Sequence, residues 1–122
     1  MGTFTELDLR VVDREDHPEG KTGYFMVMED FHYHGTFDYM VPAGTLTDLA
    51  SIPRLMRWLF NRTGPSRKAA VMHDQMYGTK WRTRKECDVG FKEMLLARNV
   101  GGLTARTYYR GVRAGGWTRG NW

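Results

Sequence analysis

The chain has little cysteine and no long apolar run. Cys87 is the one cysteine among 122 residues, which excludes an internal disulfide and suits a reducing compartment. A lone thiol also excludes a zinc site built from several cysteines. No segment approaches the roughly 20 apolar residues that a transmembrane helix needs. The opening MGTFTELDLR lacks the basic and apolar regions of a signal peptide, so we expect that no signal peptide secretes this protein.

Acidic residues are scarce in the second half of the chain. Residues 1–61 contain 5 Lys/Arg and 10 Asp/Glu, whereas residues 62–122 contain 13 and 4, which gives net charges of −5 and +9. This imbalance predicts an anionic partner for the C-terminal half, such as lipid phosphate, nucleic acid or an acidic protein surface. Attraction between the two halves of the chain explains it equally well.

Strand patterns come first along the chain and helix patterns follow. Segments 4–12, 24–28 and 36–41 are rich in β-forming residues and are separated by turns. Helical spacing of apolar residues follows, and the predicted N-terminal caps of four helices are Ser51, Ser66, Thr83 and Thr104. The residues Thr83 and Glu86 form a predicted capping box.

This order predicts an α+β fold with segregated elements. We expect a small N-terminal antiparallel β-sheet that packs on a C-terminal bundle of about four helices. The length suits a single domain over residues 1–122. Within it, residues 1–44 are expected to be mainly β, residues 45–115 mainly α, and residues 116–122 a tail.

The stretch AAVMHDQMYGTKWRTRKECD, residues 69–88, places polar groups on apolar helix faces. His73 shares a helical stripe with alanine and methionine residues, and Asp88 shares one with Phe91 and Met94. His73 and Asp88 are equally far from the midpoint of the turn between their helices, so an antiparallel pair sets them at the same height. Because a buried carboxylate is costly unless it is paired, we predict that they touch.

Two interpretations of this pair stay open. In one, a structural hydrogen bond fixes the register of the helices. In the other, Asp88 orients His73 as a general base that acts near neutral pH. Tyr77, one turn after His73, could donate its hydroxyl to Asp88, and Asp74, about 100° round the helix, could hold a metal ion or a water.

The segments TDLASIPR, HDQMY and DVGF, with their spacing, resemble an uncharacterised domain family common in tailed bacteriophages and prophages. The resemblance covers roughly residues 22–115. It implies a phage origin, a location in the virion or in the host cytoplasm, and other phage structural proteins as partners. It implies no activity.

A weaker resemblance is to phospholipase A2, especially its cysteine-free viral form, in which an HDxxY helix precedes a helix that bears an Asp. It implies that His73 activates water, Asp88 holds its ring, Tyr77 braces Asp88 and Asp74 binds calcium, with phospholipid as substrate. The glycine-rich calcium loop of those enzymes is not recognisable here. TLTDLASIP occupies a comparable place, and its Asp48 could supply a second carboxylate.

Three other hypotheses compete with a hydrolase of this kind. The adjacent His73 and Asp74 also suit a metal-dependent phosphohydrolase, which needs a further upstream His on a helix. His32 and His34 lie instead on a predicted strand, where they share a face and form either a metal pair or an exposed edge.

A non-enzymatic phage virion, tail or accessory protein needs the His-Asp-Tyr group only for its fold. Nucleic-acid binding would use the charge of the C-terminal half together with its aromatic residues, Trp81, Tyr108, Tyr109, Trp117 and Trp122.

Overall fold

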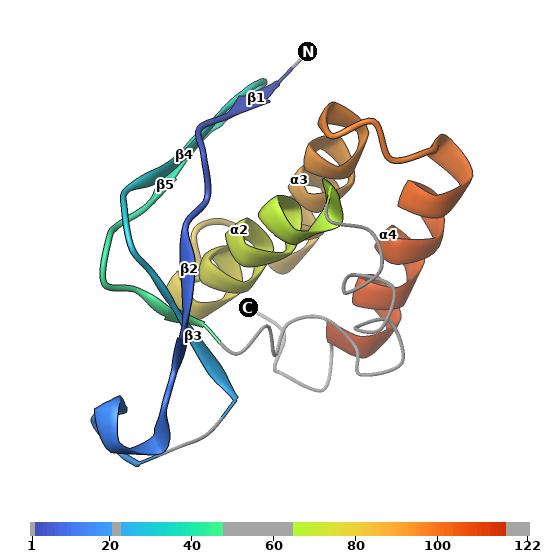
Figure 1. Ribbon diagram of the computed structural model, residues 1–122. Coiled ribbons are helices and arrows are strands. Elements are labelled where there is room, and N and C mark those ends of the chain that lie inside the picture. The colour runs from blue at the N-terminus through green and yellow to red at the C-terminus, as the bar shows by residue number, and fades with distance from the viewer. Residues whose placement is uncertain (1, 21–22, 48–64, 117–122) are drawn as a thin grey trace. The chain divides into compact units, whose positions relative to one another are not determined.

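The computed structural model describes residues 2–20, 23–47 and 65–116, and its contacts divide the chain into two compact units. The β unit is Thr3–Asp48, and the helical unit is Leu49–Trp122 together with Met1–Gly2. Strands precede helices along the chain (Figure 1). The predicted α+β class is therefore confirmed, whereas the packing of strands on helices and the single domain stay predictions.

The β unit contains two antiparallel three-stranded sheets where the sequence predicted one. In the first sheet the strand order is β1 (Thr3–Phe4), β4 (Phe31–His34) and β5 (Asp38–Val41). In the second the order is β2 (Leu9–Val12), β3 (Tyr24–Val27) and β6 (Leu46–Thr47), and a short 3₁₀ helix, η1 (Arg14–Asp16), follows β2.

The predicted strand over residues 4–12 is divided between the two sheets. Its start pairs with β4 and its end pairs with β3. Between them the Thr5 N–H donates to the His32 carbonyl, and the Asp8 carbonyl accepts from the Met28 N–H, so the chain changes its partner strand between Thr5 and Asp8.

Alternation along β4 builds the core of this unit. Phe31 and Tyr33 are buried, whereas His32 and His34 point to the other face. Phe4 from β1 stacks on Phe31 with 5.7 Å between ring centroids. The other buried apolar residues of the unit are Val12, Val27 and Val41.

The described part of the helical unit has three α-helices, α2 (Pro65–Thr79), α3 (Arg84–Ala97) and α4 (Gly102–Gly116), where about four were predicted. The helix predicted to start at Ser51 lies outside the described residues. α3 contacts both α2 and α4. The three helices bury a common core of apolar side chains: Ala69, Met72, Met76, Phe91, Met94, Leu95, Tyr108 and Val112.

Helix starts were predicted correctly in one of the three described cases. Thr83 caps α3 through the predicted capping box with Glu86. α2 starts at Pro65, so Ser66 lies within its first turn; proline suits a first helical position because its missing N–H would have no partner there. α4 starts at Gly102 rather than after Thr104, and the Gly101 carbonyl accepts the Ala105 N–H.

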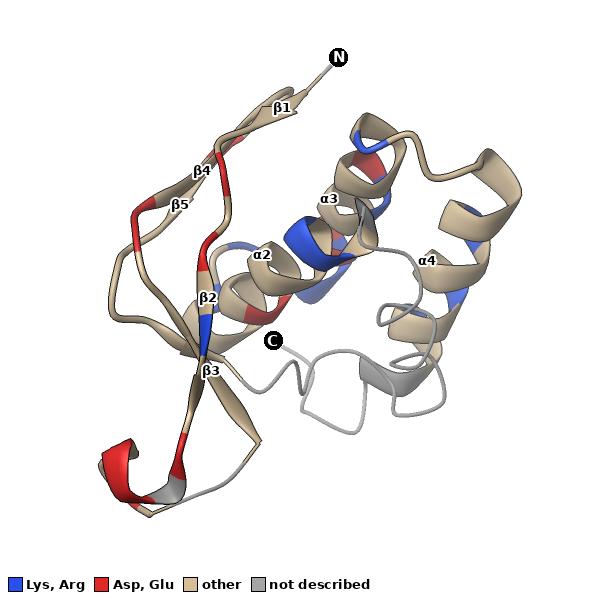
Figure 2. Ribbon diagram, in the orientation of Figure 1, with Lys and Arg blue, Asp and Glu red and all other residues tan. Residues whose placement is uncertain are grey.

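The difference in net charge is larger between the two units than between the two halves of the sequence. Thr3–Asp48 contains 3 Lys/Arg and 10 Asp/Glu, and the remaining residues contain 15 and 4, so the net charges are −7 and +11. Within the β unit the acidic residues lie mainly in η1 and in the segments that join the strands, whereas most basic residues of the described chain lie on the three helices (Figure 2). None of the described helices is long and apolar enough to cross a membrane.

Candidate functional site

His73 of α2 and Asp88 of α3 form the predicted contact. The imidazole Nε2 lies 2.7 Å from Asp88 Oδ1, and both side chains are 0% exposed. The antiparallel arrangement of α2 and α3 brings the two positions to the same height, as their equal separation from the turn predicted. The contact is confirmed, whereas the role of each residue stays a prediction.

Tyr77 lies one helical turn after His73 and binds the same carboxylate oxygen. Its hydroxyl donates to Asp88 Oδ1 at 2.5 Å, and its ring lies 4.3 Å from the His73 ring between centroids. Burial raises the pKa of Tyr77 well above its ordinary value, and the hydrogen bond to Asp88 raises it further. Tyr77 therefore remains a protonated donor throughout the neutral range.

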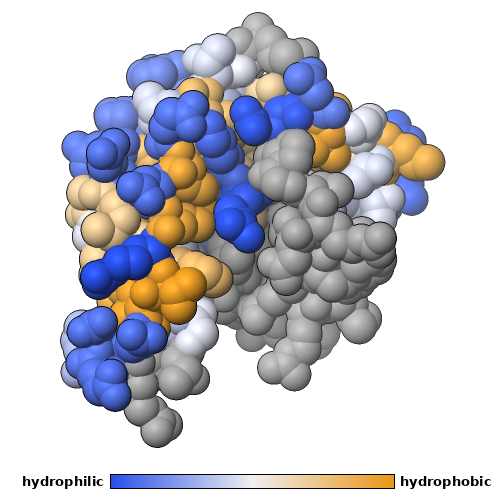
Figure 3. Space-filling view, viewed as in Figure 1, coloured by the Kyte–Doolittle hydropathy of each residue, from blue (hydrophilic) through white to orange (hydrophobic). Residues whose placement is uncertain are grey.

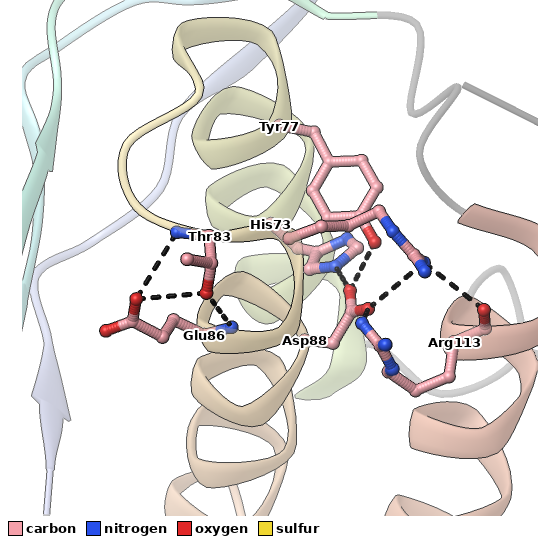
Figure 4. A network of polar contacts seen from close by, with 7 residues as sticks. His73, Tyr77, Thr83, Glu86, Asp88 and Arg113 are labelled. Carbon is pink, nitrogen blue, oxygen red and sulfur yellow. Dashed lines mark hydrogen bonds and ion pairs between the residues drawn. The ribbon is translucent and has the colours of Figure 1, made fainter. Parts of the chain in front are cut away.

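The second oxygen of Asp88 faces two guanidinium groups. Arg113 of α4 donates from Nη1 to Asp88 Oδ2 at 3.0 Å, and Arg84 Nη1 lies 3.8 Å from the same oxygen (Figure 4). Arg84 also donates to the backbone carbonyl of Arg113 at 3.2 Å. Three helices thus converge on one carboxylate. We call these five residues, His73, Tyr77, Arg84, Asp88 and Arg113, the Asp88 network.

The two arginines were not predicted as members of this site. Arg84 is four residues before Asp88, and i,i+4 spacing on one helix face is a signal that could have identified it. Arg113 lies 25 residues after Asp88 on another helix. No local pattern identifies such a partner, although a buried carboxylate requires compensating charge from somewhere.

The surroundings of His73 are aromatic and closed. Its ring contacts two aromatic rings, that of Tyr77 and that of Phe91, and the Phe91 centroid lies 4.6 Å from the His73 centroid. Cys87, next to Asp88, is also buried, and desolvation raises the pKa of its thiol to about 11, so it stays protonated and unreactive near neutral pH. A surface groove of about 390 Å³ between α3 and α4 has none of the Asp88 network in its lining.

The structure describes one of the two predicted calcium ligands. Asp74 is partly exposed on α2, at the position after His73, and Asp48 lies outside the described residues. Within residues 2–20, 23–47 and 65–116, no three His, Cys, Asp or Glu side chains are grouped so that they could hold a metal ion. Calcium binding stays a prediction.

His32 and His34 share a face of β4, as predicted, and their rings stack with 5.8 Å between centroids. His34 Nδ1 lies 2.9 Å from Asp38 Oδ1 in an exposed pair. Both histidines come from a strand, whereas the phosphohydrolase hypothesis needs a helical histidine. This placement argues against that hypothesis.

Comparison with known proteins identifies the family without an activity. A search among curated proteins and one among solved structures found no match. A family model described as protein of unknown function (DUF1353) matches residues 25–112, a range that contains His73, Tyr77 and Asp88. The match extends from β3 to α4 and covers more than half of the sequence, so the chain belongs to this uncharacterised family.

Proposed function

We propose that the protein is non-enzymatic and that the Asp88 network stabilises the packing of α2, α3 and α4. The observation that carries this proposal is the burial of the central pair: His73 and Asp88 are both 0% exposed. In the setting that the phage resemblance implies, the protein would be a virion, tail or accessory component. Its helical unit would then act as a rigid binding platform.

A general base must reach the proton that it removes, directly or through one water. The His73 side chain is instead 0% exposed, and its ring contacts Tyr77, Phe91 and Asp88. In a catalytic dyad the carboxylate also stabilises the imidazolium that forms. Here Asp88 already faces two guanidinium groups, so its negative charge is compensated before His73 takes up a proton.

A hydrolase is the second candidate, and one observation favours it. Asp88 Oδ1 is bound both by His73 Nε2 and by the Tyr77 hydroxyl, and a carboxylate bound to the imidazole is the contact that orients a histidine base. On this hypothesis His73 activates water against a phospholipid ester, with calcium held by Asp74 and Asp48. The closed ring would have to become accessible to solvent during each turnover.

Two variants of His73 distinguish the candidates. If the network is structural, His73→Ala should reduce the free energy of unfolding by about 3 kcal/mol, as expected when one partner of a buried pair is removed. The matched control is His34→Ala, which breaks an exposed His–Asp pair and should cost less than about 1 kcal/mol.

Activity is measured in parallel as fatty-acid release from mixed phospholipid vesicles with calcium present. The non-enzymatic proposal expects no release by the unmodified protein. Release that His73→Asn abolishes while the circular dichroism spectrum is retained would refute it and establish the hydrolase.

A further inference from the structure

The exposed faces of α3 and α4 combine cationic and aliphatic side chains around the groove between these helices. Lys92, Leu96, Gly102, Leu103 and Arg106 line the groove. On α3, Val89 precedes Lys92 and Leu96 at helical spacing, so the three share one stripe. On α4, Leu103, Arg106 and Arg110 form a second stripe at the same spacing. We call the set Val89, Lys92, Leu96, Leu103, Arg106 and Arg110 the α3–α4 face.

The aliphatic residues of this face are unusually open to solvent. Leu103 is 81% exposed, Val89 49% and Leu96 37%. Figure 3 shows hydrophobic surface beside hydrophilic surface where α4 begins, on the right of the view. Leu103 is in the first turn of α4, just after the reversal of the chain at Asn99, which has a φ of 62°. A leucine at the exposed start of a helix can enter a nonpolar environment without rearrangement of the fold.

The charges of the face have one dominant sign. Lys92, Arg106 and Arg110 are cationic, and Glu93 is the one acidic residue between Val89 and Leu96. They belong to a unit with a net charge of +11. Cations that flank exposed aliphatic side chains match a surface whose outer layer is anionic and whose interior is apolar.

We propose that the α3–α4 face binds the surface of anionic phospholipid bilayers, with Leu103 inserted between headgroups and Lys92, Arg106 and Arg110 on the phosphates. Nucleic acid would use the cations but leaves the leucines without a role. The proposal goes beyond the function proposed above, because none of these residues belongs to the Asp88 network.

The test is co-sedimentation of the full chain with vesicles of phosphatidylcholine alone or mixed with phosphatidylglycerol. We expect binding only to the mixed vesicles. Leu103→Ser should weaken it about tenfold through the lost burial of one leucine. Arg106→Glu should weaken it at least about fivefold, the effect of a single charge near an anionic surface.

Two control variants test whether any exposed aliphatic side chain, or any change in net charge, has the same effect on vesicle binding as a change in this face. Val11→Ser changes an aliphatic residue that is 68% exposed in the β unit, and Arg67→Glu reverses an exposed cation on α2. Both should bind mixed vesicles within twofold of the unmodified protein. Equal losses in the controls and the test variants would overturn the proposal.

Three other results would also overturn it. The first is an absence of binding to phosphatidylglycerol vesicles. The second is binding to duplex DNA that Arg106→Glu weakens while vesicles remain unbound. The third is a dimer in size-exclusion chromatography that Leu103→Ser dissociates in a protein that binds no vesicles, because the face would then join two copies of the chain.

Discussion

Replacement of Asp88 by asparagine tests the Asp88 network most directly, because it keeps the shape of the side chain and removes its charge. The carboxylate accepts hydrogen bonds from His73, Tyr77 and Arg113 and pairs with Arg84. An amide has one acceptor oxygen, so either His73 and Tyr77 or the two arginines would face an NH₂ group in place of an oxygen. Two guanidinium groups would also lose the anion between them.

The expected cost follows from the burial of these groups. Asp88 is 0% exposed, and the side chain of Arg84 is 8% exposed, so water cannot replace the lost partner at either. Removal of one member of a buried ion pair costs about 3 to 5 kcal/mol. Because a domain of this size is stable by only about 5 to 15 kcal/mol, Asp88→Asn should remove a large part of the free energy of unfolding.

The assay is urea unfolding followed by far-ultraviolet circular dichroism, in which the helical band reports the helical unit and the strand band reports the β unit. The chain offers a matched control in Asp38→Asn, since Asp38 pairs with His34 at 2.9 Å but is 77% exposed. This control should cost less than about 1 kcal/mol. Costs for Asp88→Asn and Asp38→Asn that agree within 1 kcal/mol would refute the claim that the Asp88 network stabilises the fold.

Two further predictions concern α3. Below pH 9 the Cys87 thiol is protonated in both states, but between its ordinary pKa of 9.0 and its folded pKa of about 11 the unfolded thiol ionises first. Stability should therefore fall over this window by about 2 to 3 kcal/mol, and Cys87→Ala should remove that part of the fall; an unchanged pH profile in the variant would contradict this account. Thr83 Oγ accepts the Glu86 N–H at 3.1 Å, so Thr83→Ala should cost about 1 kcal/mol in a thermal melt. Thr104→Ala, which removes no cap, should cost less than half as much, and equal costs would show that the capping box is not what stabilises the start of α3.

Local sequence patterns predicted the helices well where the residues that are buried and the residues that cap the helix lie close together in the sequence. The apolar stripes placed His73 and Asp88 on buried faces, and the short turn between their helices fixed their relative height. The Thr83 and Glu86 pair marked the start of α3 because a capping box lies within four consecutive residues. The two sheets were not predicted, since the choice between partner strands depends on residues far apart in the sequence.

The sequence by itself determined that an imidazole, a phenol and a carboxyl group meet inside a helix pair, because helical periodicity and the turn length are local properties. Only the tertiary structure decided what surrounds them. Arg113 lies on α4, 25 residues after Asp88 in the sequence, and the packing around His73 leaves its side chain 0% exposed. Compensation of a buried charge depends on which helices pack together. The same three side chains could therefore form an open catalytic dyad in one packing and a stabilising core in another.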